Sequence, residues 1–445
     1  PAFGLPLGDS HEGRVLGQFS LHVANFWELG AVGSSFGAAW EPFSEVPYTH
    51  HPPLLTFLHL AVSAVAGQGL SQVKVISYLA GLATVPAMWW VGRRLGFRAL
   101  PASVAVAAMV ATPWWWVYGR LGLGFLPNLI MIGTVWAVAG GSTPRRVCLA
   151  VVASFVAVAA SWHGVFLAPL LWLWLWRCRA LDRVVVAVGG AMAVGGLVVL
   201  VWVAQGAGFG EWGDHLGDRM VSDWGWGNFA ERQWRFARGL LPVWYLVLAL
   251  PALFAGLADA RTRFLTGALT SMVVVFALVP ADGAWIHDYW NFSVLLALFP
   301  GFTVLLDRAG SWLAQWVEGR PDGRLARSAR LRVAVAAVAG AVAVALFVLS
   351  PASRHDRDFV DPADAGYLVA AVDPAPGQSA AWHLPQVPWP TWVAHAWGLP
   401  PVALVDSSGI ATLPDGDVVV VRLDRLPAWV DPTVADHVVV RRGRY

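Results

Sequence analysis

Residues 8–14 read GDSHEGR and open the part of the chain around which the rest is arranged. From Val15 to Phe26 the apolar residues recur at helical spacing, while polar residues such as Gln18 and Asn25 fall mainly on the other side. This amphipathic pattern predicts a helix that lies along a membrane surface, with an acidic cluster at its start.

The acidic cluster contains Asp9 and Glu12, and two interpretations of Asp9 are open. An Asp or Ser just before a helix is a good N-cap because its side-chain oxygen accepts a free backbone N–H, and Asp9 or Ser10 would serve. The alternative is a functional carboxylate, since a second carboxylate, several histidines and an arginine are expected on the same membrane face.

The composition indicates a membrane protein. Of the 445 residues, 57% are hydrophobic and 13% are charged, so the polar residues could not cover the outside of a soluble globule. The net charge of +2 is too small to indicate a nucleic-acid partner. Cys148 and Cys178 lie near the predicted cytoplasmic ends of helices, and we expect no disulfide. We therefore predict an all-α protein that crosses the membrane many times.

Hydrophobic runs mark the expected spans, at residues 72–91, 100–117, 126–141, 147–160, 163–176, 183–204, 238–257, 263–279, 290–308 and 331–350. With one further span expected before Pro1, the whole protein would have about eleven. Arginine-rich joints occupy alternate connections, at residues 93–98, 145–146, 177–183, 261–263 and 320–332. By the positive-inside rule these joints are cytoplasmic, and the other connections are then extracytoplasmic.

Residues 52–68 are apolar but cannot be a full crossing in this scheme, because the run 72–91 leads inward and Asp9 is outside. We expect a re-entrant or juxtamembrane helix that starts at Pro52-Pro53, where the missing N–H costs nothing.

The long loop 205–237 is rich in tryptophan and charge, which indicates that it lies on the bilayer surface with most of its charges solvated. After Pro351 a helix start at Asp361 and strand-like runs at 380–384, 402–405, 418–423 and 437–440 predict a small α/β domain. We therefore divide the chain into an external first loop with juxtamembrane helices (1–71), a transmembrane domain (72–350) and an extracytoplasmic α/β domain (351–445).

Five short motifs occur in order: His51-Pro52-Pro53-Leu54, Arg93-Arg94-Leu95-Gly96, Tyr118-Gly119-Arg120, Trp162-His163-Gly164 and Ile286-His287-Asp288-Tyr289-Trp290. Together with the acidic cluster they resemble motifs of the GT-C glycosyltransferases, in the branch of protein O-mannosyltransferases and aminoarabinose (lipid A) transferases. The family versions read Lys-Pro-Pro-Leu or His-Pro-Pro-Leu, Gly-Arg-Arg, Tyr-Ser-Arg, Thr-Lys-Gly and His-x-Tyr-Trp. The resemblance covers roughly residues 9–305 and implies a GT-C-like fold.

The chain departs from the family pattern in three ways. Asp9 and Glu12 are not adjacent, which leaves open which of them is the catalytic carboxylate. The acidic residue expected after the Tyr-x-Arg turn is absent, and Asn128 is the nearest polar candidate. Histidine replaces lysine at positions 51 and 163, so a phosphate contact there would depend on pH.

The resemblance implies a cell-envelope enzyme of the plasma (inner) membrane that moves a sugar from a polyprenyl-phosphate donor to an extracytoplasmic protein, lipid or glycan. One carboxylate, Asp9 or else Glu12, would take the acceptor's proton, and cationic side chains would neutralise the departing phosphate. The candidates for phosphate and lipid binding are His51, Arg120, His163, Arg219 and His287.

Each phosphate candidate also has a simpler interpretation. His51 and His163 would serve as interfacial caps, His287 and Asp288 as a local hydrogen-bonded pair, and Arg219 as a residue that snorkels to lipid headgroups. Asp9, His11, His50, His287 and Asp288 include the ligand types of a divalent metal, but their spacing is not diagnostic and we assign no metal or cofactor.

Two other functional classes stay open. A transporter usually places ionisable residues within its spans, and here the spans contain almost none, with Lys74 near one end. The second alternative is a GT-C-like scaffold subunit that binds a lipid phosphate without catalysis.

Overall fold

The computed structural model describes residues 11–39, 47–49, 51–68, 70–118, 125–206, 208–220, 224–288 and 290–318, and three short strands between residues 380 and 421. The chain forms two compact units. The first contains residues 1–48, 56–78 and 355–445, and the second contains residues 49–55 and 79–354.

The first unit begins with α1 (His11–Gly33), which starts directly after Ser10 as the cap pattern predicts. The helix is interrupted at Gly30, whose φ of +73° is accessible to glycine at little cost. Its polar side is exposed only in part: Glu28 is exposed as predicted, but Gln18 and Asn25 are only 6% and 7% exposed. The amide of Asn25 donates to the carbonyl oxygen of Ala39 (3.1 Å), so the polar side is used to hold the chain that follows the helix.

Helix α2 (Leu54–Ala66) begins immediately after Pro52-Pro53, as predicted. It has 13 residues, fewer than the roughly 20 that a full span requires. The ring of His59 stacks on Phe19 of α1 with centroids 4.6 Å apart, and the indole N–H of Trp27 donates to Ser63 (2.8 Å). These contacts fix α2 against α1.

The described strands are β1 (Ala380–His383), β2 (Val402–Leu404) and β3 (Val418–Val421). They form a parallel sheet in the order β2-β1-β3, within three of the four predicted strand runs. The fourth run and the helix predicted near Asp361 lie outside the described residues, as does the span predicted at 331–350.

The second unit contains the later part of α3 (Leu70–Arg94) and the helices that follow it. They are α4 (Ala99–Val110), α5 (Pro113–Tyr118), α6 (Phe125–Ala139), α7 (Pro144–Ala160), α8 (Trp162–Arg179), α9 (Arg183–Gln205), α10 (Gly208–Met220), α11 (Gly225–Leu240), α12 (Val243–Ala258), α13 (Arg263–Leu278), α14 (Ala281–Ile286) and α15 (Val294–Glu318). Each hydrophobic run in the described part of the chain therefore corresponds to helix.

Two runs differ from the expectation in detail. The run 100–117 is divided into α4 and α5, because Pro113 starts a new helix after Thr112. In the run 238–257, helix α12 begins only at Val243. Helix α11 precedes it, with a bend of 114° between the two helices. Pro242 stands at this bend as the N-cap residue of α12.

Side-chain caps define the starts of three consecutive helices. Thr143 accepts a hydrogen bond from the Arg146 N–H before α7, and Asp182 accepts from Val184 and Val185 before α9. Between them, Ser161 accepts from the Gly164 N–H (3.1 Å) and starts α8.

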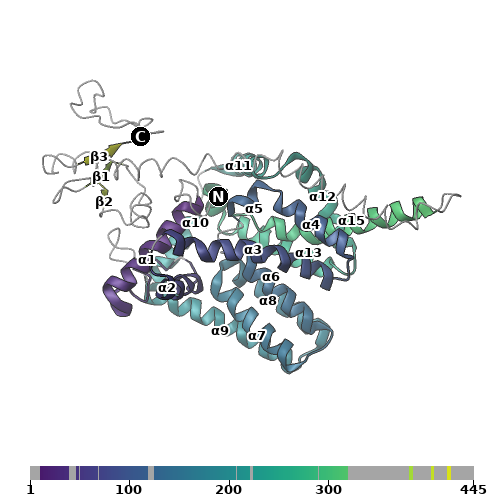
Figure 1. Cartoon of the computed structure of the whole chain (residues 1–445), viewed down its shortest axis with the longest axis horizontal. Coiled ribbons are helices and arrows are strands. Elements are labelled where there is room, and N and C mark those ends of the chain that lie inside the picture. Colours follow the sequence, from purple (N-terminus) through teal and green to yellow (C-terminus); the bar gives the residue numbers. More distant parts are fainter. Residues whose placement is uncertain are drawn as a thin grey trace, which may run out of the picture. The chain divides into compact units, whose positions relative to one another are not determined.

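Close helix pairs build the core of the second unit. Helices α7, α8 and α9 lie side by side (Figure 1) and α12 packs against α15. Gly301 of α15 faces Ala252 of α12 so closely that a Cβ at 301 would overlap the Ala252 carbonyl oxygen. Small residues thus let these helix backbones approach.

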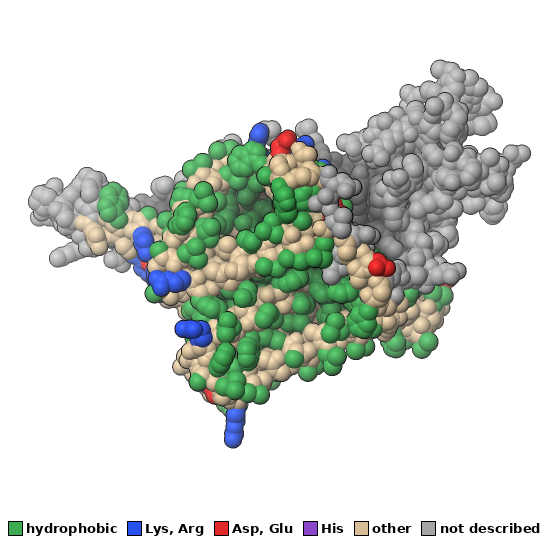
Figure 2. Space-filling view, turned by 180° about the vertical axis from the view of Figure 1, so that it is seen from behind, with side chains coloured by type: hydrophobic (Ala, Val, Ile, Leu, Met, Phe, Trp, Pro, Cys, Tyr) green, Lys and Arg blue, Asp and Glu red, His purple; other side chains and the backbone are tan. Residues whose placement is uncertain are grey.

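The outside of the second unit is apolar. Large side chains such as Leu197, Val201, Val247 and Phe254 are exposed, and Figure 2 shows a face covered largely by hydrophobic side chains. Among the described helices, three segments are long and apolar enough to cross a membrane, at Lys74–Arg94, Arg183–Gln205 and Val294–Trp312, and the bent pair of α11 and α12 would be a fourth. The chain is a multi-pass membrane protein.

Short connections join the helices and alternate between two ends of this unit. We name the end that holds residues 95–98, 140–143, 180–182 and 259–262 the arginine end. The opposite end is the aromatic end, with residues 161, 206, 208–220, 224–242, 279–288 and 290–293.

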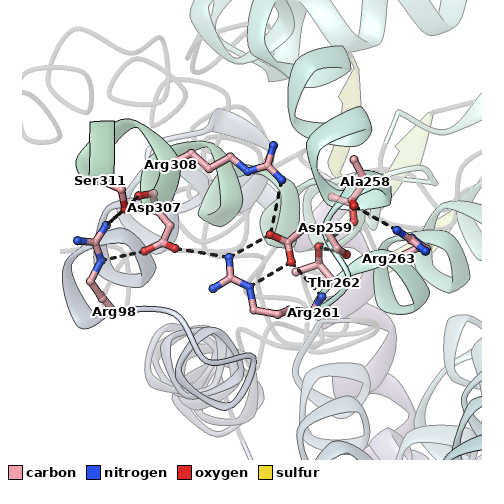
Figure 3. A network of polar contacts seen from close by, with 10 residues as sticks. Arg98, Ala258, Asp259, Arg261, Thr262, Arg263, Asp307, Arg308 and Ser311 are labelled. Atoms are coloured by element: carbon pink, nitrogen blue, oxygen red, sulfur yellow. Dashed lines mark hydrogen bonds and ion pairs between the residues drawn. The ribbon is translucent and has the colours of Figure 1, made fainter. Parts of the chain in front are cut away.

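An ion-pair network ties three elements together at the arginine end (Figure 3). Arg98 donates to the Asp307 carboxylate (2.9 Å), and Arg261 bridges Asp259 (3.0 Å) and Asp307 (3.5 Å). The hydrogen bonds from Arg261 hold the pKa of Asp259 below its ordinary value. The network fixes α4 and α15 to the connection between α12 and α13.

Candidate active site

His163 is placed at the aromatic end by the cap that starts α8. Ser161 holds the first turn, and a Cβ at Gly164 would overlap the carbonyl oxygen of Ala157, so the chain turns tightly from α7 into α8. The His163 ring lies 4.2 Å from the Phe276 ring between centroids, and its Nε2 donates to the carbonyl oxygen of Trp290 (3.5 Å). His163 is thereby joined to the segment after α14, although 127 residues separate the partners.

The segment 287–290 follows α14 and is held from several sides. The indole N–H of Trp290 donates to the carbonyl oxygen of Phe276 in α13 (2.8 Å), and the Trp290 ring stacks on the Phe276 ring. The His287 ring is stacked with Trp290 at 6.0 Å. One phosphate candidate, His287, thus lies in this segment, and a second, His163, contacts it.

The neighbouring Asp288 accepts a hydrogen bond from the hydroxyl of Tyr118 (2.5 Å). Tyr118 is the last residue of α5 and is 4% exposed. Arg120 follows two residues later and lies outside the described residues. The interpretation of His287 and Asp288 as a purely local pair is therefore incomplete, since Asp288 contacts a helix far away in the sequence.

His51 is held at the end of α9. The indole N–H of Trp202 donates to the carbonyl oxygen of His51 (3.0 Å), and Thr49 packs against Gly206. The His51 side chain is half-buried. This places a third phosphate candidate at the aromatic end of the second unit.

Helix α10 carries Arg219, whose side chain is outside the described residues. The helix packs against α9 and α14, and its Trp212 stacks on Trp162 with centroids 6.0 Å apart. The Arg219 backbone therefore belongs to an element that contacts the helix just before His287.

Helix α11 is more closely packed than a loop on the bilayer surface. Trp226 and Trp234 are 62% and 54% exposed, as an aromatic belt requires, but Trp224 stacks on Trp285 at 5.2 Å. Arg232 lies over the Trp285 ring (4.8 Å) and no carboxylate within the described ranges pairs with it. Arg232 is not among the site residues predicted from the sequence, where only the alternation of Trp, Phe and Arg along the helix indicates it.

The amides Gln233 and Asn291 connect α11 to this segment. Gln233 donates to the carbonyl oxygen of Ala284 (2.6 Å) and accepts from Asn291 (2.7 Å). Asn128, in the first turn of α6, is fully buried, and neither of its amide atoms has a partner among the residues that the structure describes.

The acidic cluster is only partly described. Glu12 lies in the first turn of α1, with its side chain outside the described residues, and Asp9 lies before them. Within the part of the chain that is described, no three His, Cys, Asp or Glu side chains are grouped to hold a metal ion. Asp9, His50 and the side chain of His11 lie outside the described residues.

The described geometry defines a class of protein: a helical, multi-pass membrane protein with histidine, carboxylate and aromatic side chains gathered at one end. No protein-family model matches the chain, and no curated protein matches it.

Solved structures do match it. The chain is similar to ArnT from Cupriavidus metallidurans bound to undecaprenyl phosphate, with a TM-score of 0.59 and 15% identity over 93% of this chain and 86% of that one. The apo state of the same protein gives a TM-score of 0.51 and 16% identity over 93% and 85%. At this identity the likeness shows the fold, and it confirms the GT-C-like fold that the motifs implied.

Proposed function

We propose that this chain is a glycosyltransferase that moves a sugar from a polyprenyl-phosphate donor to an acceptor at the extracytoplasmic face of the plasma (inner) membrane. The observation that carries the proposal is the likeness of fold to ArnT in complex with undecaprenyl phosphate. The gathering of His163, His287 and the Tyr118–Asp288 pair at one end of this fold supports it.

The proposed reaction requires one base, which takes a proton from the acceptor, and one leaving group, which is the polyprenyl phosphate. Asp9, or Glu12 in its place, takes the proton of the acceptor's hydroxyl or amine as the acceptor atom forms a bond to the anomeric carbon. The bond from that carbon to the phosphate oxygen breaks, and the polyprenyl phosphate leaves with the electron pair. No nucleotide is required, because the energy resides in the glycosyl-phosphate bond.

Cationic side chains stabilise the charge on the departing phosphate. Histidine when protonated and arginine both donate charge-assisted hydrogen bonds to phosphate oxygens. We assign this role to His51, Arg120, His163, Arg219 and His287. The arginine end is then cytoplasmic by the positive-inside rule, and the aromatic end faces the donor in the outer leaflet.

Purified protein in lipid vesicles with a panel of radiolabelled polyprenyl-phosphate sugars and membrane acceptors tests the proposal. Transfer of label to an acceptor supports the enzyme. Binding of the donor without transfer by any member of the panel would instead favour the scaffold subunit, and passage of a solute without donor binding would favour a transporter.

A further inference from the structure

Arg232 of α11 is a cation whose position is fixed by aromatic rings. Its guanidinium carbon lies 4.8 Å from the centroid of the Trp285 ring in α14, and 5.3 Å from the centroid of the Phe236 ring one turn further along α11. Contacts of this kind are favourable for arginine, because the guanidinium is planar and more weakly hydrated than an ammonium group. The two rings therefore restrict where the guanidinium lies.

The Trp285 ring is itself anchored. Trp224 stacks on it with centroids 5.2 Å apart, and the Trp224 indole N–H donates to the carboxylate of Asp282 in α14 (3.3 Å). On the other side of the sequence, Gln233 donates to a backbone carbonyl oxygen of α14 (2.6 Å). Arg232 thus stands between two anchored contacts, and a ligand that binds it pays little to order the side chain.

No counter-charge accompanies this cation in the described part of the chain. The carboxylate of Glu231, the preceding residue, lies 3.7 Å from Arg235 instead, and Asp282 accepts from the Trp224 indole. The Arg232 Nε–H is buried and has no hydrogen-bond partner among the residues that the structure describes. A partly desolvated cation without a partner is unfavourable by itself, and an anion from outside the chain would supply the missing charge.

The surface of α11 indicates which anion this is. Trp226 and Trp234, on the same helix, are 62% and 54% exposed, as is typical of side chains at the level of lipid headgroups. Phosphate is the common anionic group at that level, and the N–H groups of arginine match the geometry of its oxygens. The shared chemistry is a lipid phosphate, which belongs either to the polyprenyl donor or to an anionic phospholipid.

We propose that Arg232 binds the phosphate group of a membrane lipid at the aromatic end, in a site formed by α11 and the Trp285 ring of α14. The site goes beyond the proposed function, because it needs no sugar transfer and would be present in a scaffold subunit as well. Helix α11 is also tied to the candidate active site, since Gln233 accepts a hydrogen bond from Asn291 (2.7 Å) in the segment that follows α14.

Lipid binding by the purified full-length protein in neutral detergent micelles tests the proposal, with undecaprenyl phosphate and phosphatidylglycerol as separate probes and bound lipid counted by native mass spectrometry. We expect Arg232→Gln to weaken the binding of at least one probe by about tenfold, because a charge-assisted hydrogen bond is lost. Arg235→Gln is the matched control. It removes a charge from the same helix, but that arginine is exposed and already faces Glu231, so binding should change by less than about twofold.

The two probes distinguish the sources of the phosphate. A loss confined to undecaprenyl phosphate assigns the site to the donor, and a loss confined to phosphatidylglycerol assigns it to a phospholipid. A loss for both probes supports a site that recognises the phosphate alone. Unchanged binding of both probes in Arg232→Gln, or an equal loss in Arg235→Gln, would overturn the proposal.

Folding and the proposed function are tested separately. Thermal unfolding of each variant shows whether the fold is intact, and Arg232→Met keeps an apolar stem against the rings without the charge, so it replaces Arg232→Gln if that variant unfolds. Sugar transfer by wild type, with lipid binding unchanged in Arg232→Gln, would refute the lipid site and leave the proposed function intact. Lipid binding that depends on Arg232 in a protein without transfer would refute the proposed function and leave the site intact.

Discussion

His51 and His163 stand where similar motifs carry lysine, and their surroundings differ. His163 is 8% exposed, lies between the Phe276 and Phe292 rings, and uses Nε2 to hold the Trp290 carbonyl. His51 is half-buried, and its backbone carbonyl accepts a hydrogen bond from the Trp202 indole. Because burial disfavours the charged form of an imidazole, we expect His51, the less buried of the two, to be the residue whose charge meets the phosphate.

We predict that binding of undecaprenyl phosphate falls as pH rises, because a neutral imidazole at position 51 no longer attracts the phosphate charge. In His51→Lys this fall should be greatly reduced, since lysine stays protonated to about pH 10. Undecaprenyl phosphate binding by wild type and His51→Lys in nanodiscs, measured as a function of pH, tests this prediction. His59→Gln, in α2, serves as the control for removal of a histidine, and an unchanged pH profile in His51→Lys would contradict the role of His51.

At the residue scale, short-range chemistry was predictable and long-range contacts were not. The turn at Trp162-His163-Gly164 follows from Ser161 as a cap and from the glycine after it. The pairing of Tyr118 with Asp288 spans 170 residues and depends on how α5 and α14 pack, which no local pattern specifies.

At the scale of elements, α12 and α15 depend on a close backbone approach at Gly301. We predict that Gly301→Ala lowers the thermal unfolding midpoint, since its Cβ would overlap the Ala252 carbonyl and overpacking typically costs about 1–3 kcal/mol. Gly190→Ala in α9 is the matched control: its Cβ meets nothing within 4 Å, and the change should be neutral or stabilise by about 0.5–1 kcal/mol.

Tryptophan fluorescence during heating in detergent compares these two glycine variants directly. Equal midpoints for Gly301→Ala and Gly190→Ala would show that the α12–α15 contact does not contribute to stability.

Hydrophobic runs predicted the long helices, but not the short ones at the aromatic end. Helices α8, α9 and α13 begin within one residue of the predicted runs: α9 and α13 begin at arginine-rich joints, and α8 begins at the Ser161 cap. Helices α10, α11 and α14 lie in stretches rich in Gly, Trp and charge, where tertiary packing rather than hydropathy stabilises the helix. Likewise, α1 buries Gln18 and Asn25 against the amphipathic pattern, and the Asn25 amide is satisfied by the Ala39 carbonyl oxygen.

At the scale of the whole molecule, the orientation in the membrane is a prediction of the arginine pattern. In a background without Cys148 and Cys178, Trp226→Cys should react with an impermeant maleimide in intact cells, and Arg145→Cys only after permeabilisation. Both positions are exposed, so access by the reagent reports the side of the membrane. Labelling of Arg145→Cys in intact cells would show that the orientation is the reverse of the predicted one.

The same assay tests whether α2 crosses the bilayer. Gln68 is exposed just after α2, and we predict that Gln68→Cys is labelled from outside, because a helix of 13 residues is too short for a full span. Protection of Gln68→Cys in intact cells, with labelling on permeabilisation, would show that α2 crosses and would change the span count.

Sugar transfer from a radiolabelled polyprenyl-phosphate donor in vesicles, by wild type, Asp9→Asn and Glu12→Gln, tests whether the acidic cluster supplies the catalytic base. Asparagine keeps a side-chain oxygen that is able to serve as a helix N-cap, but it cannot take the acceptor's proton. We predict that wild type transfers the label and that Asp9→Asn transfers it about 10²–10⁴-fold more slowly, with donor binding and thermal stability unchanged. Loss of transfer in Glu12→Gln alone would move the base to Glu12, and full transfer in both variants would contradict the catalytic role of the acidic cluster.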